Sequence, residues 1–395
     1  MLGIPDFKND KELFQYLLSS KNAETISLKK IFESYNFKFT ELESSVDEIF
    51  SSDNILLIDA RSEKEFEEDP VPGAINFPVL SNSERHFTGL AYTKFSQSSA
   101  VRLAIDYAEP KKEKLLNFLN KNNASEKRII VYCWRGGGRS KYLSKMINDL
   151  GFSTEIISGG QKKYRAIVND FFKAEIFPYK LIELSGMTGC GKTDLLNFMR
   201  KFHPVIDLEK SALHFSSLFG FVPYKIRGFK PVKNQSAFEN RLFGEIKKES
   251  LRSDFSNLFL TESESRKIGD FFIPHNLYSA IENAPCINIT SSIENRIKRI
   301  RDAYFGDYEK GKEEMLLIFQ NKERYFKKEL STNIYNEAMN SLRNDDVNKF
   351  IEIMLISLYD KIYKVKPKKP LLEISSDNLD KAKDEIMNFL KGNIL

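Results

Sequence analysis

Short apolar runs alternate with longer stretches of helical periodicity along most of the chain, an alternation typical of parallel α/β folds. In the first half, four apolar runs predict buried strands, at residues 55–58, 74–77, 129–132 and 154–157. In the second half, five runs predict strands, at residues 179–184, 205–208, 257–260, 287–289 and 371–374. The segments between them predict helices, so the pattern favours an α/β fold in two successive units.

The first unit is preceded by a segment of different character. Residues 11–35 predict one or two short amphipathic helices, so we interpret residues 1–45 as an N-terminal helical extension. The first domain then spans residues 46–173. It includes a helix predicted at residues 139–150, which ends at a glycine.

The second unit begins where a proline interrupts a helical stretch. Pro178 marks this boundary, so the second domain spans residues 178–395. Charged helices are predicted within it at residues 293–304 and 312–330. A chain of 395 residues is long enough for two domains of ordinary size.

Composition narrows the class of protein. Apolar residues make up 41% of the chain and the net charge is only +5, so any nucleic-acid surface must be local. The three cysteines, Cys133, Cys190 and Cys286, are odd in number and widely spaced, which excludes a disulfide framework and indicates a reducing compartment. No run approaches the roughly 20 apolar residues of a membrane helix, and the N-terminus is not a signal peptide. We therefore expect a cytoplasmic protein with no membrane partner.

A cysteine followed by three glycines marks the first candidate site. Cys133 comes directly after an apolar strand, and a helix is predicted to begin near Arg139. Consecutive glycines let several amide groups converge on one point, and the helix N-terminus adds positive charge. A thiol beside such an anion site should ionise easily and attack a phosphate-like or thiosulfate-like group. We predict Cys133 as the catalytic residue and expect the anion loop to consist of Arg135, Gly136, Gly137, Gly138, Arg139 and Ser140.

A P-loop is the second candidate site. The pattern G-x-x-x-x-G-K-[ST] lies between a predicted strand and a predicted helix, the context that the motif requires. Its residues are Gly186, Met187, Thr188, Gly189, Cys190, Gly191, Lys192 and Thr193. The backbone should cradle a diphosphate or triphosphate, with Lys192 on its terminal phosphate and Thr193 available for Mg²⁺.

Acidic partners for such a metal should follow another strand. Glu262 and Glu264 are the first candidates and Asp207 is the second choice, although the sequence fixes no metal site. A P-loop identifies the phosphate of a ligand but not a reaction, since kinases, ATPases and other diphosphate-binding proteins share it.

Segments of the first domain resemble a rhodanese domain over residues 54–166. The matching segments are Leu-Leu-Ile-Asp-Ala-Arg at 56–61, Pro-Gly-Ala-Ile-Asn at 72–76, the loop at 133–140 and the Gly-Gly turn at 159–160. The resemblance implies a rhodanese-like α/β domain. Five residues separate Cys133 from Arg139, one more than in the usual sulfurtransferase. The same length occurs in rhodanese-like phosphatases of the cell-cycle type.

The fusion of both motifs in one chain resembles the tRNA 2-selenouridine synthase family, over residues 54–305. Beyond the two loops, the similar segments are 207–209, 216–220, 235–242 and 262–269. The implied fold is α/β in two domains, with an N-terminal rhodanese-like α/β domain and a C-terminal P-loop NTPase-like parallel α/β domain.

The resemblance also implies a transferase. The family replaces the sulfur of a wobble 2-thiouridine in tRNA by selenium from selenophosphate, through an S-geranyl-2-thiouridine made from geranyl diphosphate. By this resemblance Cys133 would carry a selanyl group, selenophosphate would lie at residues 136–140, and the P-loop would hold the diphosphate, with Mg²⁺ as a further candidate. One alternative is a rhodanese-type sulfurtransferase or phosphatase with a regulatory nucleotide-binding P-loop domain. Another is a nucleotide-binding regulatory protein, which the intact Cys133 disfavours.

A tRNA surface should be basic and partly aromatic. The segment 221–236 carries basic but no acidic residues, interleaved with Tyr224 and Phe229, and an ordinary solvated loop is the equal alternative. Its candidate tRNA contacts are Lys225, Arg227, Lys230 and Lys233. A second basic cluster is expected to be the solvent-facing side of a helix and contains Arg296, Lys298, Arg299 and Arg301.

Overall fold

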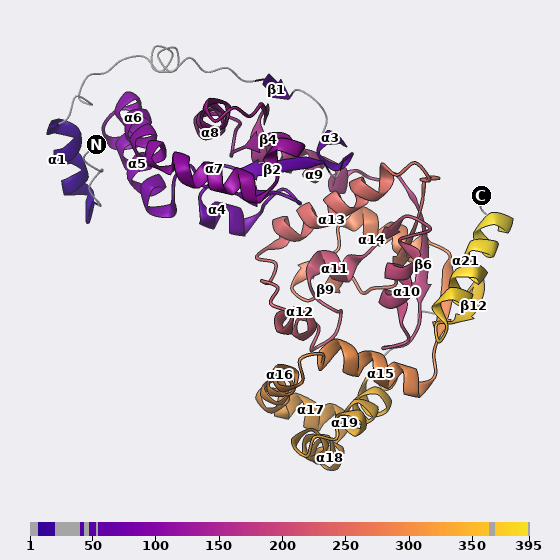
Figure 1. The fold of residues 1–395 in the computed structure, drawn as a ribbon. Coiled ribbons are helices and arrows are strands. Elements are labelled where there is room, and N and C mark those ends of the chain that lie inside the picture. Colours follow the sequence, from indigo (N-terminus) through magenta and orange to yellow (C-terminus); the bar gives the residue numbers. More distant parts are fainter. Residues whose placement is uncertain (1–6, 20–39, 43–46, 53, 363–367, 394–395) are drawn as a thin grey trace. The chain divides into compact units, whose positions relative to one another are not determined.

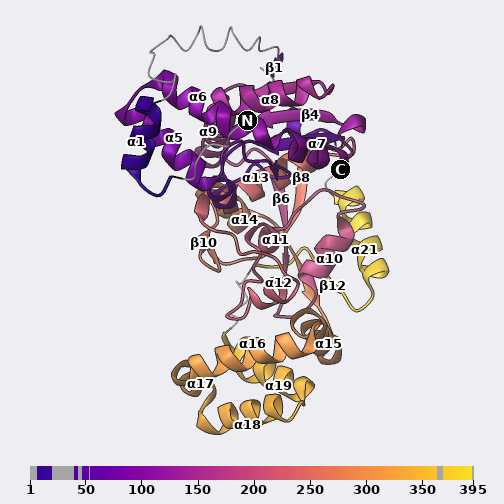
Figure 2. The same ribbon diagram turned by 60° about the vertical axis from the view of Figure 1, so that its left-hand side comes forward.

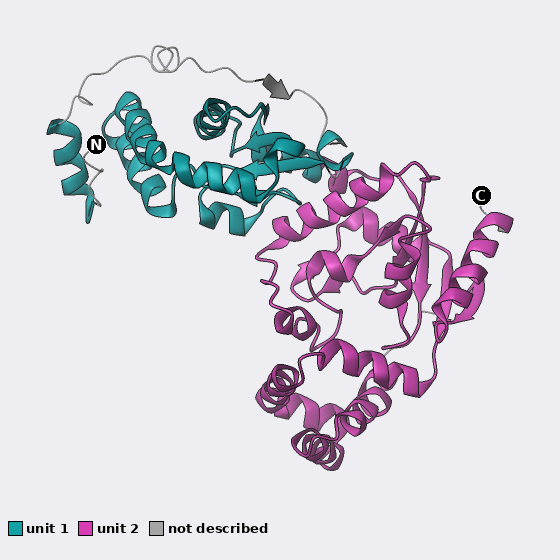
Figure 3. Ribbon diagram, viewed as in Figure 1, with its two compact units in different colours: residues 1–169 teal, residues 170–395 magenta. Residues whose placement is uncertain are grey.

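The structure is a computed structural model, and it describes residues 7–19, 40–42, 47–52, 54–362 and 368–393 (Figure 1). The chain forms two compact units, residues 1–169 and residues 170–395 (Figure 3). The part of the predicted N-terminal helices that falls on residues 20–35 lies outside the described residues.

The first unit is built on a five-stranded parallel sheet with the order β1-β5-β4-β2-β3. Its strands are β1 (Thr40–Leu42), β2 (Ile55–Asp59), β3 (Ile75–Asn76), β4 (Arg128–Tyr132) and β5 (Thr154–Ile157). Its helices are α1 (Asp10–Ser19), α3 (Asp47–Phe50), α4 (Glu63–Glu68), α5 (Asn82–Lys94), α6 (Gln97–Ala108), α7 (Lys112–Lys121), α8 (Gly138–Asp149) and the start of α9 (Gly160–Lys173). The four strands predicted for this half are confirmed.

The sheet of the first unit is buried on both faces, and successive side chains of a strand point to opposite faces. Leu56 and Ile58 of β2 pack in one cluster with Ile129 and Val131 of β4, and α7 and α8 cover them. Leu57 lies between the two β2 residues and is buried as well, on the opposite side of the strand. Strands covered on both sides give the continuous apolar runs seen in the sequence.

The segment expected to be an N-terminal extension contributes to the first unit. Strand β1 was not predicted, and it pairs in parallel with β5, with Thr40 opposite Glu155. Leu13 and Leu17 of α1 are fully buried in a cluster with Leu103 of α6. The described parts of residues 1–45 therefore supply an edge strand and a packed helix.

The second unit contains another five-stranded parallel sheet, with the order β12-β11-β6-β8-β7. Its strands are β6 (Lys180–Ser185), β7 (Val205–Ile206), β8 (Leu258–Glu262), β11 (Cys286–Thr290) and β12 (Leu372–Ser375), and β9 (Lys267–Ile268) and β10 (Phe271–Phe272) form a small hairpin. Its helices before the last two strands are α10 (Lys192–Met199), α11 (Leu208–Ala212), α12 (Val222–Ile226), α13 (Gln235–Ser250) and α14 (His275–Asn283), and α21 (Leu379–Asn393) follows β12. The five predicted strands are present, and β6, which leads into the P-loop, is central.

A group of helices is inserted between β11 and β12, and it lies at one end of the unit in both views (Figures 1 and 2). These helices are α15 (Ile293–Tyr304), α16 (Tyr308–Asn321), α17 (Glu323–Leu330), α18 (Thr332–Arg343), α19 (Val347–Met354), a π-helical turn (Leu355–Tyr359) and α20 (Asp360–Ile362). They share a core of their own around Phe319, Phe326 and Phe350. The prediction of one helix over residues 312–330 is wrong, because α16 ends at Asn321 and α17 begins at Glu323.

Candidate functional site

The loop that carries Cys133 joins β4 to α8. The thiol is buried, and its Sγ lies 3.3 Å from the hydroxyl oxygen of Ser140 in the first turns of α8. Gly136 has a φ of +66°, and a Cβ built on it would lie 2.6 Å from the carbonyl oxygen of Ile157. The loop can therefore follow this path only with glycine at that position.

The start of α9 holds the loop from behind. The amide of Gln161 donates to the carbonyl oxygen of Cys133 at 2.9 Å, and the amide of Lys162 donates to that of Trp134 at 2.9 Å. The backbones approach so closely that a Cβ on Gly160 would lie 2.1 Å from the Cys133 oxygen. The Gly-Gly turn recognised in the sequence thus fixes the position of the cysteine.

The other two glycines of the loop face open space. A Cβ on Gly137 or Gly138 would meet no atom within 4 Å. Helix α8 begins at Gly138 without a side-chain cap on its N-cap residue, Gly137. Free amide groups at a helix N-terminus bind anions, so a tetrahedral oxyanion fits beside the sulfur.

The two loop arginines differ in their surroundings. Arg135 is exposed, whereas Arg139 makes two hydrogen bonds to the carboxylate of Glu65, at 2.5 and 3.2 Å. Arg85 of α5 binds the same carboxylate at 2.9 Å. Burial alone would raise the pKa of Glu65, but these contacts outweigh it and lower the pKa. The positive charge of Arg139 is therefore partly offset by Glu65.

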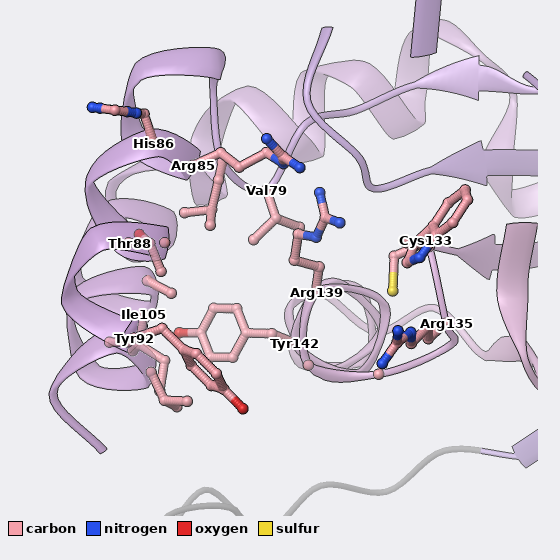
Figure 4. A pocket seen from close by; sticks show the side chains of 18 of the residues that line it. Val79, Arg85, His86, Thr88, Tyr92, Ile105, Cys133, Arg135, Arg139 and Tyr142 are labelled. Carbon is pink, nitrogen blue, oxygen red and sulfur yellow. The ribbon is translucent and has the colours of Figure 1, made fainter. Parts of the chain in front are cut away.

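A cavity of about 680 Å³ opens beside the sulfur, entirely within the first unit (Figure 4). Its wall opposite Cys133 comes from α5 and α6, and includes Tyr92 and Ile105. Tyr142 of α8 forms another part of the lining, and Arg135 and Arg139 lie near the sulfur. The cavity is thus apolar on one side and polar at the anion loop, a combination that the sequence did not indicate.

The P-loop has the geometry that its sequence predicts. It follows β6, and α10 begins at Lys192. Gly189 and Gly191 have φ values of +75° and +85°, which other residues adopt only with strain. The Nζ of Lys192 donates to the carbonyl oxygen of Gly186 at 2.8 Å, so the ammonium group lies over the loop where a phosphate would bind.

Carboxylates gather around the hydroxyl of Thr193. Its Oγ1 donates to Glu209 at 2.9 Å and lies 3.3 Å from Glu262. Oxygens of Glu209, Glu262 and Glu264 lie within 4.8 Å of one another. The structure thus brings both first-choice acids to the P-loop and adds Glu209, which sequence analysis did not select. Its signal was available, because Glu209 is in the segment 207–209 noted for its similarity to the family.

These carboxyl groups hold their protons more tightly than usual. Burial raises the pKa of Glu209 and raises that of Glu262 well above its ordinary value, with repulsion from neighbouring carboxylates as a further cause for Glu262. Burial and the charge of Glu209 raise the pKa of Glu264 to about 8. Buried carboxylate oxygens gathered at one point are the ligands that a divalent metal such as Mg²⁺ prefers.

Two other predicted positions have structural roles. Asp207, the second-choice metal ligand, caps α11 by accepting from the amide of Lys210 at 2.8 Å. It is absent from the cluster of carboxylates that the described residues place beside Thr193. Cys190 is buried in the core beneath the P-loop with Leu195 and Ile287.

The P-loop opens into a cavity of about 890 Å³ in the second unit. Lys192, Thr193 and Glu264 line it on the polar side, and Tyr304 and Tyr359 line it on the side of the inserted helices. A narrower apolar cavity of about 50 Å³ shares Tyr304 and Tyr359 with it and continues towards Phe350 and Met354. The site can therefore take a ligand with an anionic head and an apolar tail.

The proposed tRNA segment is exposed in part. Lys225, Arg227, Lys230 and Lys233 are all exposed. Lys225 lies on the short helix α12 and forms an ion pair with Glu314 at 2.5 Å, so the segment is not an irregular loop throughout. Phe229 is 53% exposed and packs edge-on against Tyr224.

The second basic cluster is not a simple solvated face. Arg296 is buried, donates to the carbonyl oxygen of Thr188 in the P-loop at 2.9 Å and pairs with Asp360. Arg299 donates to the carbonyl oxygen of Ser376 at 2.7 Å. The expectation of a solvent-facing side is therefore wrong for these two arginines, which connect α15 to the P-loop and to the end of β12.

Comparison with known families assigns both units. Residues 179–393, more than half of the chain, match the family described as the tRNA 2-selenouridine synthase AAA domain. Residues 43–167 match the rhodanese-like domain. In the part of the chain that the structure describes, no helix is long and apolar enough to cross a membrane.

Two curated relatives have the name tRNA 2-selenouridine synthase. A tRNA 2-selenouridine synthase of Nitrosomonas europaea is 29% identical over 253 residues, which cover 63% of this chain and 63% of that protein. One of Pseudomonas syringae pv. syringae is 31% identical over 253 residues, which cover 64% of this chain and 66% of that protein. The match thus spans slightly less than two thirds of these relatives.

Proposed function

The chain belongs to the tRNA 2-selenouridine synthase AAA domain family, and we propose that it is a transferase that replaces the sulfur of a wobble 2-thiouridine in tRNA by selenium. The observation that carries this proposal is the intact cysteine loop. Cys133 lies at an open anion site in a rhodanese-like domain of the same chain. A sulfurtransferase or phosphatase would use the same loop, and the family of the P-loop domain favours the selenouridine synthase over both.

At the cysteine loop, selenophosphate is the proposed anion. Its phosphate oxygens would bind the amides at Gly137 and Gly138, which places selenium next to Cys133. The net exchange requires no oxidant or reductant. S-geranyl-2-thiouridine, selenophosphate and water give 2-selenouridine, geranylthiol and phosphate. The C2–S and P–Se bonds break, the C2–Se and P–O bonds form, and the leaving sulfur takes a proton.

At the P-loop, geranyl diphosphate is the proposed ligand. Lys192 would bind the diphosphate, and the apolar continuation past Tyr304 towards Met354 suits the start of an isoprenoid chain. Thr193, Glu209 and Glu262 would hold Mg²⁺, which would neutralise charge on the departing diphosphate. The product of this step is S-geranyl-2-thiouridine, the substrate of the exchange.

The tRNA is proposed to contact the exposed basic segment that contains Lys225 and Arg227. Phosphate contacts of this kind give affinity without reading the base. A cytoplasmic location follows from a tRNA substrate.

Nucleoside mass spectrometry tests the proposal. The full-length protein is incubated with tRNA that contains 2-thiouridine, together with geranyl diphosphate and selenophosphate. We expect S-geranyl-2-thiouridine to appear first and 2-selenouridine afterwards. Unmodified 2-thiouridine, together with sulfur transfer from thiosulfate or release of phosphate from an aryl phosphate, would favour the sulfurtransferase or phosphatase instead.

A further inference from the structure

The cavity beside Cys133 contains an apolar region that a tetrahedral anion does not need. We propose that this region binds the geranyl chain attached to the base sulfur while selenium replaces that sulfur. The inference rests on the proposed function and assigns the hydrocarbon to the first unit during the exchange step. The P-loop cavity would bind the same chain only earlier, as the diphosphate.

The cavity has the size of a ligand site. Its volume of about 680 Å³ lies within the range of roughly 300–1,000 Å³ found for small-molecule pockets. A selenophosphate ion at the start of α8 would fill only the end near Gly137 and Gly138. The remaining space therefore has to be occupied by another part of a substrate or by water.

The chemistry of the remaining wall favours a hydrocarbon. Val79, Leu80 and Ile105 are almost completely buried and still line the cavity. Ala104 and Leu90 extend the same wall along α6 and α5. A charged or strongly polar group placed against these side chains would lose its hydration without gaining hydrogen bonds.

The positive charge at the polar edge of the cavity is partly compensated. Arg85 and Arg139, which line the cavity together, both bind the carboxylate of Glu65. The single carboxylate offsets one of these two positive charges, so the charge that remains lies at the polar end of the cavity, beside the glycine loop. The strongest free anion site remains the glycine loop, so the anion and the hydrocarbon are assigned to different ends of one cavity.

This arrangement also suits the bond that breaks. The incoming selenium at Cys133 must reach C2 of the base, and the sulfur leaves that carbon together with the geranyl chain. An apolar site next to the thiol binds the chain of the substrate and of the departing geranylthiol, and it excludes water from the reacting carbon. A 2-thiouridine without the chain would leave the apolar wall uncovered and should exchange poorly.

Trp134 provides a direct readout, because it lines the cavity and is the single tryptophan of the chain. We would titrate the full-length protein with S-geranyl-2-thiouridine and follow tryptophan fluorescence, with 2-thiouridine as the comparison. The geranylated nucleoside is expected to bind at least tenfold more tightly. Equal affinity for the two nucleosides would overturn the proposal.

Substitutions that fill the cavity provide a second test of the proposal. Ala104→Phe and Gly89→Phe each place a ring at a cavity position, and a Cβ on Gly89 would meet no atom within 4 Å, so the second variant should fold. Both should weaken binding of the geranylated nucleoside at least tenfold. Lys94→Phe adds the same ring to α5 at a residue that is exposed and does not line the cavity, and it should bind as the unaltered protein does. Unchanged binding by both cavity variants would contradict the assignment.

Activity separates this inference from the proposed function. With tRNA that is already geranylated, Ala104→Phe should lower kcat/KM for selenium exchange at least tenfold, while geranylation of 2-thiouridine tRNA continues at the normal rate. If the unaltered protein does not exchange selenium, the proposed function fails, and the fluorescence titration still decides whether the cavity binds the chain. If exchange proceeds normally in both cavity variants, the function stands and the cavity proposal fails.

Discussion

The two glycine-rich loops use the same backbone device for different chemistry. Each follows the end of a parallel strand and leads into a helix N-terminus, and each contains at least one glycine with positive φ. At the first loop a buried thiol faces a mainly apolar cavity, whereas at the second Lys192, Glu209 and Glu264 line a more polar one. The backbone therefore selects an anion at both sites, and the neighbouring side chains determine the reaction.

Removing the thiol of the first loop should have the largest effect on activity. Cys133→Ala is expected to abolish selenium incorporation while the fold is retained, because the small side chain faces the cavity and alanine replaces only its sulfur. Nucleoside mass spectrometry and a thermal melt check the two parts. Cys190→Ala and Cys286→Ala should keep normal incorporation, since both cysteines are buried in the second unit. A comparable loss in either variant would require a relay of two cysteines.

At the P-loop, Lys192→Ala should weaken diphosphate binding at least tenfold. A charge-assisted hydrogen bond contributes about 1.5–3 kcal/mol, and each 1.4 kcal/mol corresponds to about a factor of ten. Calorimetric titration with geranyl diphosphate measures the change. Supplying geranylated tRNA should restore selenium exchange to Lys192→Ala, and a variant that remains inactive with that substrate would show that the two loops do not act separately.

A moderate effect is expected at Glu65, which pairs with Arg139 of the first loop and with Arg85 of α5. Its folded-state pKa lies below the ordinary value of 4.5. Its contribution to stability is therefore complete above that pH and is lost as the pH falls through the lowered pKa. Glu65→Gln should cost roughly 1–3 kcal/mol at neutral pH and should flatten the acid side of the stability profile of the first unit. Denaturant melts from pH 3 to 7 test this, and an unchanged profile would show that the pair contributes nothing.

The smallest effect should come from the exposed basic segment. Replacing Lys225 and Arg227 by alanine is expected to weaken all cognate tRNAs about equally and to reduce the slope of log affinity against log salt by roughly 0.7 to 0.9 per lost contact. The loss of the Lys225–Glu314 ion pair should cost little, since the lysine side chain is 55% exposed. Diphosphate binding should stay unchanged. An unaltered salt slope would remove the segment from the tRNA surface.

Strand positions and both loops could be predicted from the sequence because their signals are local. An apolar run, a glycine with a required φ and a motif spacing each depend on neighbouring residues. Glu209 and the compensation of Arg139 by Glu65 depend on contacts between distant segments. The same holds for Arg296, whose basic neighbours suggested a solvated face although it binds a P-loop carbonyl oxygen. Pairwise contacts of this kind leave no local pattern.

The central claim is that the P-loop serves geranylation and the cysteine loop serves selenium exchange. The nucleosides that Cys133→Ala produces test this claim most directly. The variant is incubated with 2-thiouridine tRNA, geranyl diphosphate and selenophosphate, and the tRNA is digested and analysed by mass spectrometry. We predict that S-geranyl-2-thiouridine accumulates and that 2-selenouridine is absent. The appearance of 2-selenouridine, or the absence of the geranylated nucleoside from a folded variant, would contradict the account.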